Sequence, residues 1–150
     1  MSTLLDTNVL TRLLQPDHPH HAHARDAVKL LLDRGEDLYI VPQNVYEFWV
    51  VATRPAGENG FGMPAAQARD ELAQLKRLFT LLRDERGILQ QWERLVVDHD
   101  VKGKTAHDAR LVAAMERHGV RRLLTFNADH FARFRGITVV TPGGVLQAAR

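Results

Sequence analysis

The strongest constraint on the fold is an acid that directly follows a short apolar run near the N-terminus. Thr3-Leu4-Leu5 indicates a buried strand, and Asp6 stands between it and a segment whose apolar residues recur at helical spacing. A strand that leads into a helix is the first unit of an α/β sheet, and ligands bind at the carboxyl edge of such strands. Asp6 is therefore expected at that edge, where it either caps the helix or belongs to a site.

Strands and helices alternate through the remainder of the chain. Apolar runs predict strands at 38–41, 80–82, 122–125 and 137–140. Amphipathic stripes predict helices at 9–14, 24–32, 44–53, 65–79, 88–96 and 105–119, with a loop at 55–64 and a polar turn at 127–134. Because parallel strands need helical crossovers, this alternation predicts an α/β fold with a mainly parallel sheet and helices on both faces. No repeat or linker divides residues 1–150, so one domain is expected.

Composition narrows the possible function classes. The 150 residues carry 20 Lys and Arg against 18 Asp and Glu, a formal charge of +2 that permits an anionic partner without requiring one. The absence of cysteine excludes disulfides, thiol catalysis and thiolate zinc sites. No apolar run is long enough to span a membrane and no secretory signal precedes Asp6, so we expect a cytoplasmic protein.

Two further acids stand in unusual contexts. Glu47 is the single charge in 44–53, a segment dense in aromatic and β-branched residues. Its helix is therefore expected to have little solvent face, and a cation is expected beside the carboxylate. Asp108 follows Thr105 by three residues, which is the spacing of a capping box, so a purely structural role at a helix start stays open.

A shared site would explain all of these acids together. Mg²⁺ takes carboxylate oxygens from separate parts of a fold and keeps several waters. A metal-bound water becomes a nucleophile near neutral pH, and the ion offsets charge on phosphate oxygens, so such sites serve phosphoryl chemistry. A fourth ligand is expected from the turn after Thr125, where Asn127 offers a neutral carbonyl and Asp129 a carboxylate.

Four segments, in this order, resemble the motifs of PIN domains, and within that family those of the VapC-type toxins of bacterial toxin–antitoxin pairs. The segments are Leu5 to Leu10, Tyr46 to Phe48, His107 to Ala114 and Leu124 to Asn127. Each motif alone is weak, but the ordered set is specific, and it covers nearly the whole chain. The resemblance implies a single three-layer α/β/α domain.

The resemblance also implies roles for individual residues. The family's acids correspond to Asp6, Glu47 and Asp108. Thr7 corresponds to the hydroxyl that supports the metal shell, and Thr125 to the threonine of the last motif. The family often has a fourth acid two residues after that threonine. Asn127 stands there in this sequence, so either Asn127 or Asp129 would complete the site.

The activity implied by the resemblance is a Mg²⁺- or Mn²⁺-dependent endoribonuclease that leaves 5′-phosphate and 3′-hydroxyl ends. A homodimer is implied as well and, for a toxin, a VapB-like antitoxin whose tail blocks the acidic pocket. An acidic pocket repels RNA, so basic residues should flank it. The candidates are Arg54, Lys104 and Arg110, for each of which solvated surface charge is the alternative.

Two sets of histidines suggest other sites. One set precedes the helix 24–32 and consists of His18, His20, His21 and His23. These residues could hold a transition metal, although surface polarity is the simpler interpretation. The other set consists of His107, His118 and His130. These could serve a metal-free ribonuclease that works through a cyclic phosphate.

Other functions fit the α/β outline less completely. An aspartyl-phosphate enzyme would use Asp6 as its nucleophile, but Asn8 stands where that class of phosphatase has its second acid. The chain has no Gly-rich nucleotide loop after its first strand. A PIN-like domain with an incomplete acid set could bind RNA or protein without cleavage, and a complete one could process RNA without being a toxin.

Overall fold

The computed structural model describes residues 1–150 as a five-stranded sheet covered by helices. The strands are β1 (Ser2–Leu5), β2 (Asp37–Ile40), β3 (Thr80–Leu81), β4 (Arg122–Leu124) and β5 (Thr138–Val140), in the order β3-β2-β1-β4-β5. All neighbouring strands are parallel, which confirms the predicted α/β fold.

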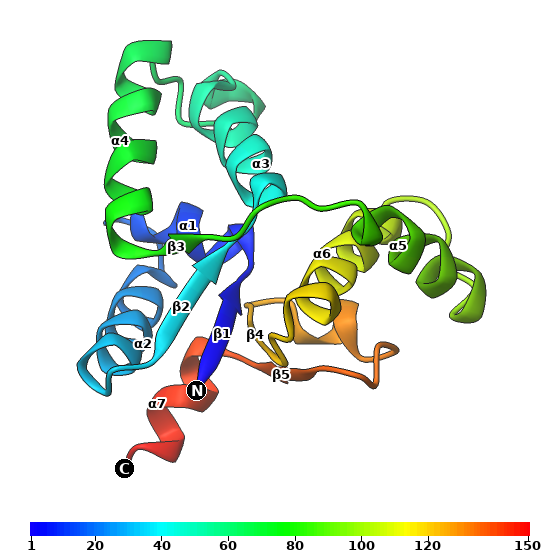
Figure 1. The fold of residues 1–150 in the computed structure, drawn as a ribbon. Helices are drawn as coiled ribbons and strands as arrows, with labels where there is room; N and C mark the ends of the chain where they lie inside the picture. Colours follow the sequence, from blue (N-terminus) through cyan, green and yellow to red (C-terminus); the bar gives the residue numbers. More distant parts are fainter.

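Seven α-helices connect and cover the strands. They are α1 (Thr7–Leu13), α2 (His21–Asp33), α3 (Pro42–Thr53), α4 (Ala65–Leu78), α5 (Gly87–Asp98), α6 (Thr105–His118) and α7 (Pro142–Ala148). Two short 3₁₀ turns, η1 (Ala56–Glu58) and η2 (Ala128–Phe131), lie in the expected loop and polar turn. Figure 1 shows α5 and α6 on one side of the sheet, α2 and α7 on the other, and α3 and α4 beyond the carboxyl ends of the strands. No helix has the length and apolar character needed to cross a bilayer.

Side chains that alternate along β1 separate two hydrophobic cores. Leu5 belongs to a buried cluster built mainly with α1, α2, α3 and α4, whereas Leu4 belongs to a cluster built mainly with α5 and α6. The buried residues of α2 are Ala24, Ala27, Val28 and Leu31, which lie on the stripe that predicted the helix. The result is the three-layer α/β/α arrangement expected from the sequence.

The central position of β1 brings its carboxyl end beside that of β4. Leu5 pairs with Leu124, and the Asp6 amide extends the ladder by donating to the Leu124 carbonyl at 2.9 Å. The Thr125 amide donates in the same way to the carbonyl of Val140 at 3.0 Å. Asp6 and Thr125 are therefore neighbours at one edge of the sheet.

The C-terminal helix α7 is absent from the elements expected from the sequence. Pro142 is its first residue, and the Thr141 hydroxyl caps it by accepting a hydrogen bond from the Gly144 amide at 3.0 Å. Gly143 and Gly144 lower the helix propensity of its first turn. The cap and the packing of α7 against α2 compensate for that weakness.

Candidate functional site

Asp6 is almost fully buried where β1 passes into α1. It is the N-cap of α1, and its Oδ1 accepts a hydrogen bond from the Thr7 amide at 2.7 Å. Its Oδ2 accepts a second bond, also 2.7 Å long, from the Thr125 hydroxyl. Only 9% of the residue is exposed. The cap interpretation is thus correct for one carboxylate oxygen, while the other lies against the neighbouring strand end.

A polar network holds Asp6 against the segment that follows β4. Asn8 Nδ2 donates to Asp6 Oδ2 at 3.4 Å and to Thr125 Oγ1 at 3.3 Å. Asn8 Oδ1 accepts from the Phe126 amide at 3.2 Å, and Thr125 Oγ1 accepts from the Asn127 amide at 3.0 Å. These contacts orient the Asp6 carboxylate through neutral groups, so no cation of the protein neutralises it.

Glu47 reaches the same edge of the sheet from α3. Thr7 Oγ1 donates to Glu47 Oε1 at 2.8 Å and accepts from Asn44 Nδ2 at 3.1 Å. Asn44 is fully buried and also donates to the Leu5 carbonyl at 3.0 Å. The Thr7 hydroxyl therefore links α3, which carries Glu47, to the start of α1, whose N-cap is Asp6.

Two expectations about Glu47 are wrong. Its helix has a clear solvent face, because Tyr46 is 64% and Val50 is 54% exposed. No basic side chain forms an ion pair with Glu47, whose partner is the Thr7 hydroxyl. The carboxylate is half-buried and in contact with solvent, so it does not need the counter-ion that a fully buried charge would require.

Asp108 lies in the first turn of α6 without capping it. The N-cap is Lys104, Thr105 is already helical, and no side chain makes a capping hydrogen bond, so the predicted capping box is not formed. The Asp108 side chain is 27% exposed, and His130 Nδ1 lies 4.0 Å from its Oδ2. The Asp108 carboxylate is therefore available for a role other than capping.

Gln43 connects the helices that carry Glu47 and Asp108. It lies one turn before Glu47 on α3, is 7% exposed, and donates from Nε2 to the His107 carbonyl at 2.8 Å. Its Oε1 is buried without a partner. The sequence does not predict this contact, because its only signal is a polar residue at the start of an apolar helix.

Asn8 and Asn44 are the other site residues that the motifs left without a role. Asn8 follows Asp6 by two residues, and Asn44 follows the end of β2 closely. Asparagine is common at helix starts for local capping, and Asn44 does accept from the Val41 amide at 2.8 Å. Only the fold shows that both amides also reach across to other strands and helices.

A polar pocket of about 540 Å³ lies beside these acids. Its lining contains no hydrophobic residue and consists of Glu47, Lys104, Thr105, His107, Asp108, Asp129, His130 and Arg133. Asp129 thus shares the pocket with Glu47 and Asp108. Asn127 is not among the lining residues, and its amide is directed to Thr125.

The basic residues considered for RNA contact lie in different places. Lys104 lines the pocket. Arg54 donates to the Asn59 carbonyl at 2.9 Å, and Arg110 pairs with Asp84 at 3.1 Å, so both are engaged outside the pocket lining. Arg133 lines the pocket although no motif pointed to it.

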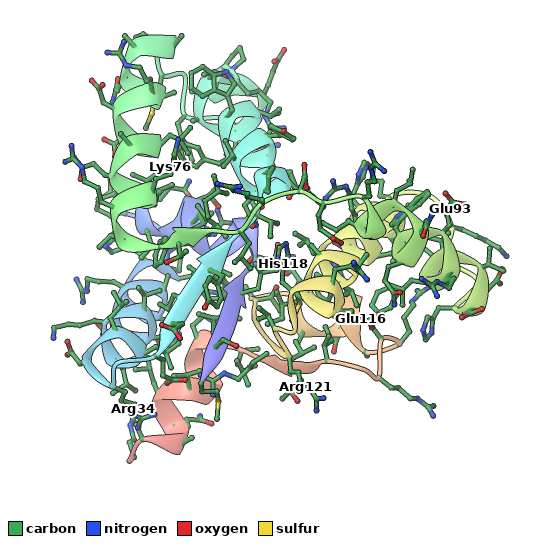
Figure 2. The ribbon with its side chains drawn as sticks, in the orientation of Figure 1. Arg34, Lys76, Glu93, Glu116, His118 and Arg121 are labelled. Carbon is green, nitrogen blue, oxygen red and sulfur yellow. The ribbon has the colours of Figure 1, made fainter.

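The histidines form no metal cluster, and two of the three considered for metal-free catalysis lie in the pocket. His107 and His130 line the pocket, whereas His118 ends α6 (Figure 2). A ring nitrogen of His118 lies 2.7 Å from the Arg83 carbonyl. No three His, Asp or Glu side chains form a ready-made metal cage, in the histidine-rich turn before α2 or elsewhere.

Burial and mutual repulsion perturb the acids of the site. Burial raises the pKa of Asp6 to about 6, although hydrogen bonds from Thr125 and Thr7 act to lower it; Asp108 and Glu47 raise it further. Burial likewise raises the pKa of Asp108, where His130 acts in the opposite direction and Glu47 in the same one. Three carboxylates from different elements are therefore close enough to repel one another.

This donor set fits a hard divalent cation that keeps part of its water shell. Mg²⁺ is commonly held by one or two carboxylates, with waters and substrate phosphates as further ligands, so a closed cage of three side chains is not required. Asp108 raises the pKa of Asp6 through space, and a dication between the two carboxylates would relieve that repulsion. The protein supplies oxygen donors and no thiolate, as such an ion prefers.

Comparison with known proteins agrees with the topology. A search of curated proteins found no significant match. Among solved structures, VapBC2 from Rickettsia felis, bound to a DNA fragment from its promoter, has a TM-score of 0.72 at 13% identity, covering 94% of this chain and 98% of that chain. VapBC-1 from nontypeable Haemophilus influenzae has a TM-score of 0.70 at 14% identity, with coverages of 95% and 99%.

VapC20 from Mycobacterium tuberculosis, a Sarcin-Ricin loop cleaving toxin, has a TM-score of 0.66 at 18% identity, with coverages of 88% and 95%. At these identities the likeness is one of fold. The model of the PIN domain family matches residues 3–137, which include nearly all of β1, the whole of β2, β3 and β4, and all of the acids described above; β5 follows the matched segment. The chain therefore belongs to the PIN domain family.

Proposed function

We propose that the protein is a Mg²⁺- or Mn²⁺-dependent endoribonuclease that hydrolyses RNA phosphodiester bonds. The observation that carries the proposal is the convergence of Asp6, Glu47 and Asp108, from a strand end and two helices, on one edge of the sheet. Neutral hydrogen-bond donors hold Asp6 and Glu47 in place, and no cation of the protein satisfies either carboxylate. Such an arrangement suits an ion that arrives with waters and phosphate.

Each acid has a distinct task in this proposal. Asp6 and Asp108 would hold the ion directly, and Glu47 would either join them or orient the attacking water. Thr7 holds Glu47, and Thr125 holds Asp6. When bound, the ion would supply an activated water at neutral pH and offset charge on the phosphate. Asp129 completes the acidic shell, because it lines the pocket whereas Asn127 does not.

Lys104 and Arg133 are the proposed contacts for the RNA backbone. Both line the pocket that holds Glu47 and Asp108, and neither forms an ion pair with an acid. Cations beside an acidic centre offset its repulsion of the approaching phosphates.

The biological role we propose is the toxin of a toxin–antitoxin pair, with a VapB-like antitoxin as its partner. The likeness of fold to VapBC proteins and to a Sarcin-Ricin loop cleaving toxin supports this assignment. We expect the protein to be a homodimer in the cytoplasm. The exposed apolar face of α3 offers a surface for contact between the two subunits.

Cleavage of a mixed panel of RNAs, followed by end-group analysis, tests the activity. We expect cleavage with Mg²⁺ or Mn²⁺, none with EDTA, and products with 5′-phosphate and 3′-hydroxyl ends. Cyclic-phosphate products that form in EDTA contradict the metal mechanism and favour histidine catalysis. Inducible expression, with and without the protein encoded by the neighbouring reading frame, tests the toxin role separately.

The position of Asn127 keeps one other function open, that of a PIN domain that binds RNA or protein without cleaving it. An asparagine stands where the family often has an acid, and its side chain makes no hydrogen bond in the site. RNA binding that persists without cleavage in either metal identifies this second function.

A further inference from the structure

An aromatic stack borders the acidic site on the side of α2. The imidazole of His20 and the ring of Phe126 lie 4.7 Å apart between centroids, with an interplanar angle of 12°. His20 is exposed and Phe126 is half-buried, so solvent reaches the stack through the histidine.

A backbone hydrogen bond holds Phe126 beside the acids of the site. Phe126 lies between Thr125 and Asn127, and its amide donates to Asn8 Oδ1 at 3.2 Å. Asn8 Nδ2 in turn contacts Asp6 Oδ2. The ring packs against the core that contains Leu5, which leaves its position little freedom.

A local turn positions the His20 ring. His20 immediately precedes α2, and its amide donates to His18 Nδ1 at 3.0 Å. The rings of His18 and His20 lie 5.3 Å apart at 59°. His21 Nδ1 lies within hydrogen-bond distance of the Arg12 carbonyl, at 2.9 Å. The histidine-rich turn thus supports one ring on the Phe126 face, and it contains no metal cluster.

The stack and the polar pocket both adjoin the acids of the site. The polar pocket with Lys104 and Arg133 is lined by residues of α6 and η2, whereas the stack lies at the start of α2 and is joined to Asp6 through Asn8. A single strand whose phosphate lies at Asp6 and Asp108 would have backbone contacts on one side and an aromatic surface on the other. Such surfaces bind bases of any sequence, since every base has a π-face.

We propose that the His20–Phe126 stack is a subsite for a nucleobase that flanks the phosphodiester at the acidic centre. The inference rests on the proposed nuclease function and adds to it a site for the base, where the acids and cations account only for the backbone.

Binding of a fluorescein-labelled, mixed-sequence single-stranded RNA, measured by anisotropy in EDTA, tests the subsite without cleavage. His20→Ala and Phe126→Leu should each weaken binding at least about fivefold, the lower end for loss of one base–aromatic stack. Leucine at position 126 keeps an apolar side chain against the core, and a thermal melt checks that the fold is intact. His23→Ala is the matched control, because His23 is exposed on α2 and has no aromatic neighbour.

An abasic oligonucleotide of the same length separates stacking from backbone contact. The wild-type protein and His20→Ala should bind it equally, since it offers no base to the stack. If His20→Ala loses the same factor of affinity for the normal and the abasic strand, the proposal is overturned, and His20 contacts the RNA backbone instead. RNA binding by His20→Ala that equals that of the wild type also overturns the proposal. This holds even if the variant loses the binding of a protein partner instead.

Cleavage assays on the same proteins keep the subsite and the nuclease function apart. If the wild-type protein cleaves RNA in Mg²⁺ but His20→Ala binds RNA as tightly as the wild type, the nuclease function stands and the subsite is overturned. A base-dependent loss of binding in a protein that never cleaves supports the subsite and contradicts the nuclease function.

Discussion

The Thr125 hydroxyl donates a 2.7 Å hydrogen bond to Oδ2 of Asp6, across 119 residues of sequence. The same hydroxyl accepts from the Asn127 amide and from Asn8 Nδ2. One small side chain at the end of β4 therefore joins the first acid of the chain to the turn that leads to Asp129. The bond also acts to lower the pKa of Asp6, in opposition to burial.

Thr125→Val should reduce metal-dependent cleavage by about 10- to 100-fold, as expected when a group that supports a metal ligand is lost. Valine keeps the shape of threonine but cannot donate to Asp6, so the concentration of Mg²⁺ needed for half-maximal activity should rise. Titration of activity with Mg²⁺ measures both effects. Thr125→Ser, which keeps the hydroxyl, should restore most of the activity; equal activity of the valine and serine variants contradicts the role.

Asp6 should make the fold less stable as the pH rises from about 4 to about 6. Its pKa is about 6 in the folded protein against an ordinary 3.8, so the folded state holds a proton that the unfolded state has released in this range. The full difference corresponds to about 3 kcal/mol. Asp6→Asn should therefore raise the free energy of unfolding at pH 7.5 but not at pH 4, because asparagine caps a helix as well as aspartate does.

Urea denaturation at the two pH values measures this effect. Glu85→Gln is the control, and its effect on the pH dependence of the free energy of unfolding should have the opposite sign. The reason is that a hydrogen bond from Arg117 lowers the pKa of the exposed Glu85. If the free energy of unfolding depends on pH in the same way for the parent and for Asp6→Asn, Asp6 is not a buried, ionised group at neutral pH.

Neutralising the other acids should abolish cleavage without unfolding the protein. We expect Glu47→Gln and Asp108→Asn each to lower the cleavage rate at least about 100-fold, more than the loss of a supporting group. Asp108→Asn should also leave the melting temperature unchanged or raised, since Asp108 caps nothing and is repelled by Glu47. Full activity in either variant removes that residue from the site, and a marked fall in melting temperature restores a structural role.

Gln43→Leu should lower kcat about tenfold or more while the KM for RNA stays near its parent value. Gln43 supports the spacing between the helices of Glu47 and Asp108 and lines no part of the pocket, and small displacements at a reacting centre are costly. Gln67→Leu, at an exposed position on α4, is the matched control. A rise in KM with unchanged kcat instead assigns Gln43 to substrate binding.

Lys104→Ala and Arg133→Ala should each weaken RNA binding and reduce its salt dependence. One lost phosphate contact lowers the slope of log K against log salt by about 0.7 for a single strand. Arg135→Ala is the control, because Arg135 is exposed close to Arg133 in sequence but outside the pocket. An unchanged slope for Arg133→Ala identifies it as a solvated surface charge.

Periodicity predicts most of the fold because it reflects burial directly. The stripe on α2 and the apolar runs of β1, β2, β4 and β5 are consequences of packing on a sheet, and they can be read without knowing the partners. The helix α7 shows the limit of that approach. Its glycines weaken the local signal, and its stability depends on a cap at Thr141 and on contact with α2.

The acids proposed for the site follow from motifs in the sequence, but their environment does not. Asp6 and Glu47 follow from their positions in ordered segments, whereas the solvent face of α3 depends on which elements leave Tyr46 and Val50 uncovered. Lys104 and Arg110 look equivalent in sequence, and only the fold pairs Arg110 with Asp84. Gln43 is marked only as a polar residue at the start of an apolar helix, because its contact joins two helices that are distant in sequence.

The central place of β1 in the sheet has a consequence for how the protein is made. A ribosome releases Asp6 and Glu47 early, but β1 lacks one of its two neighbours until β4 emerges, after α6 with Asp108. Contacts between such distant segments form late, since a long loop must close first. A nascent chain consequently carries Asp6 and Glu47 without Asp108 and Thr125 until α6 and β4 have left the ribosome.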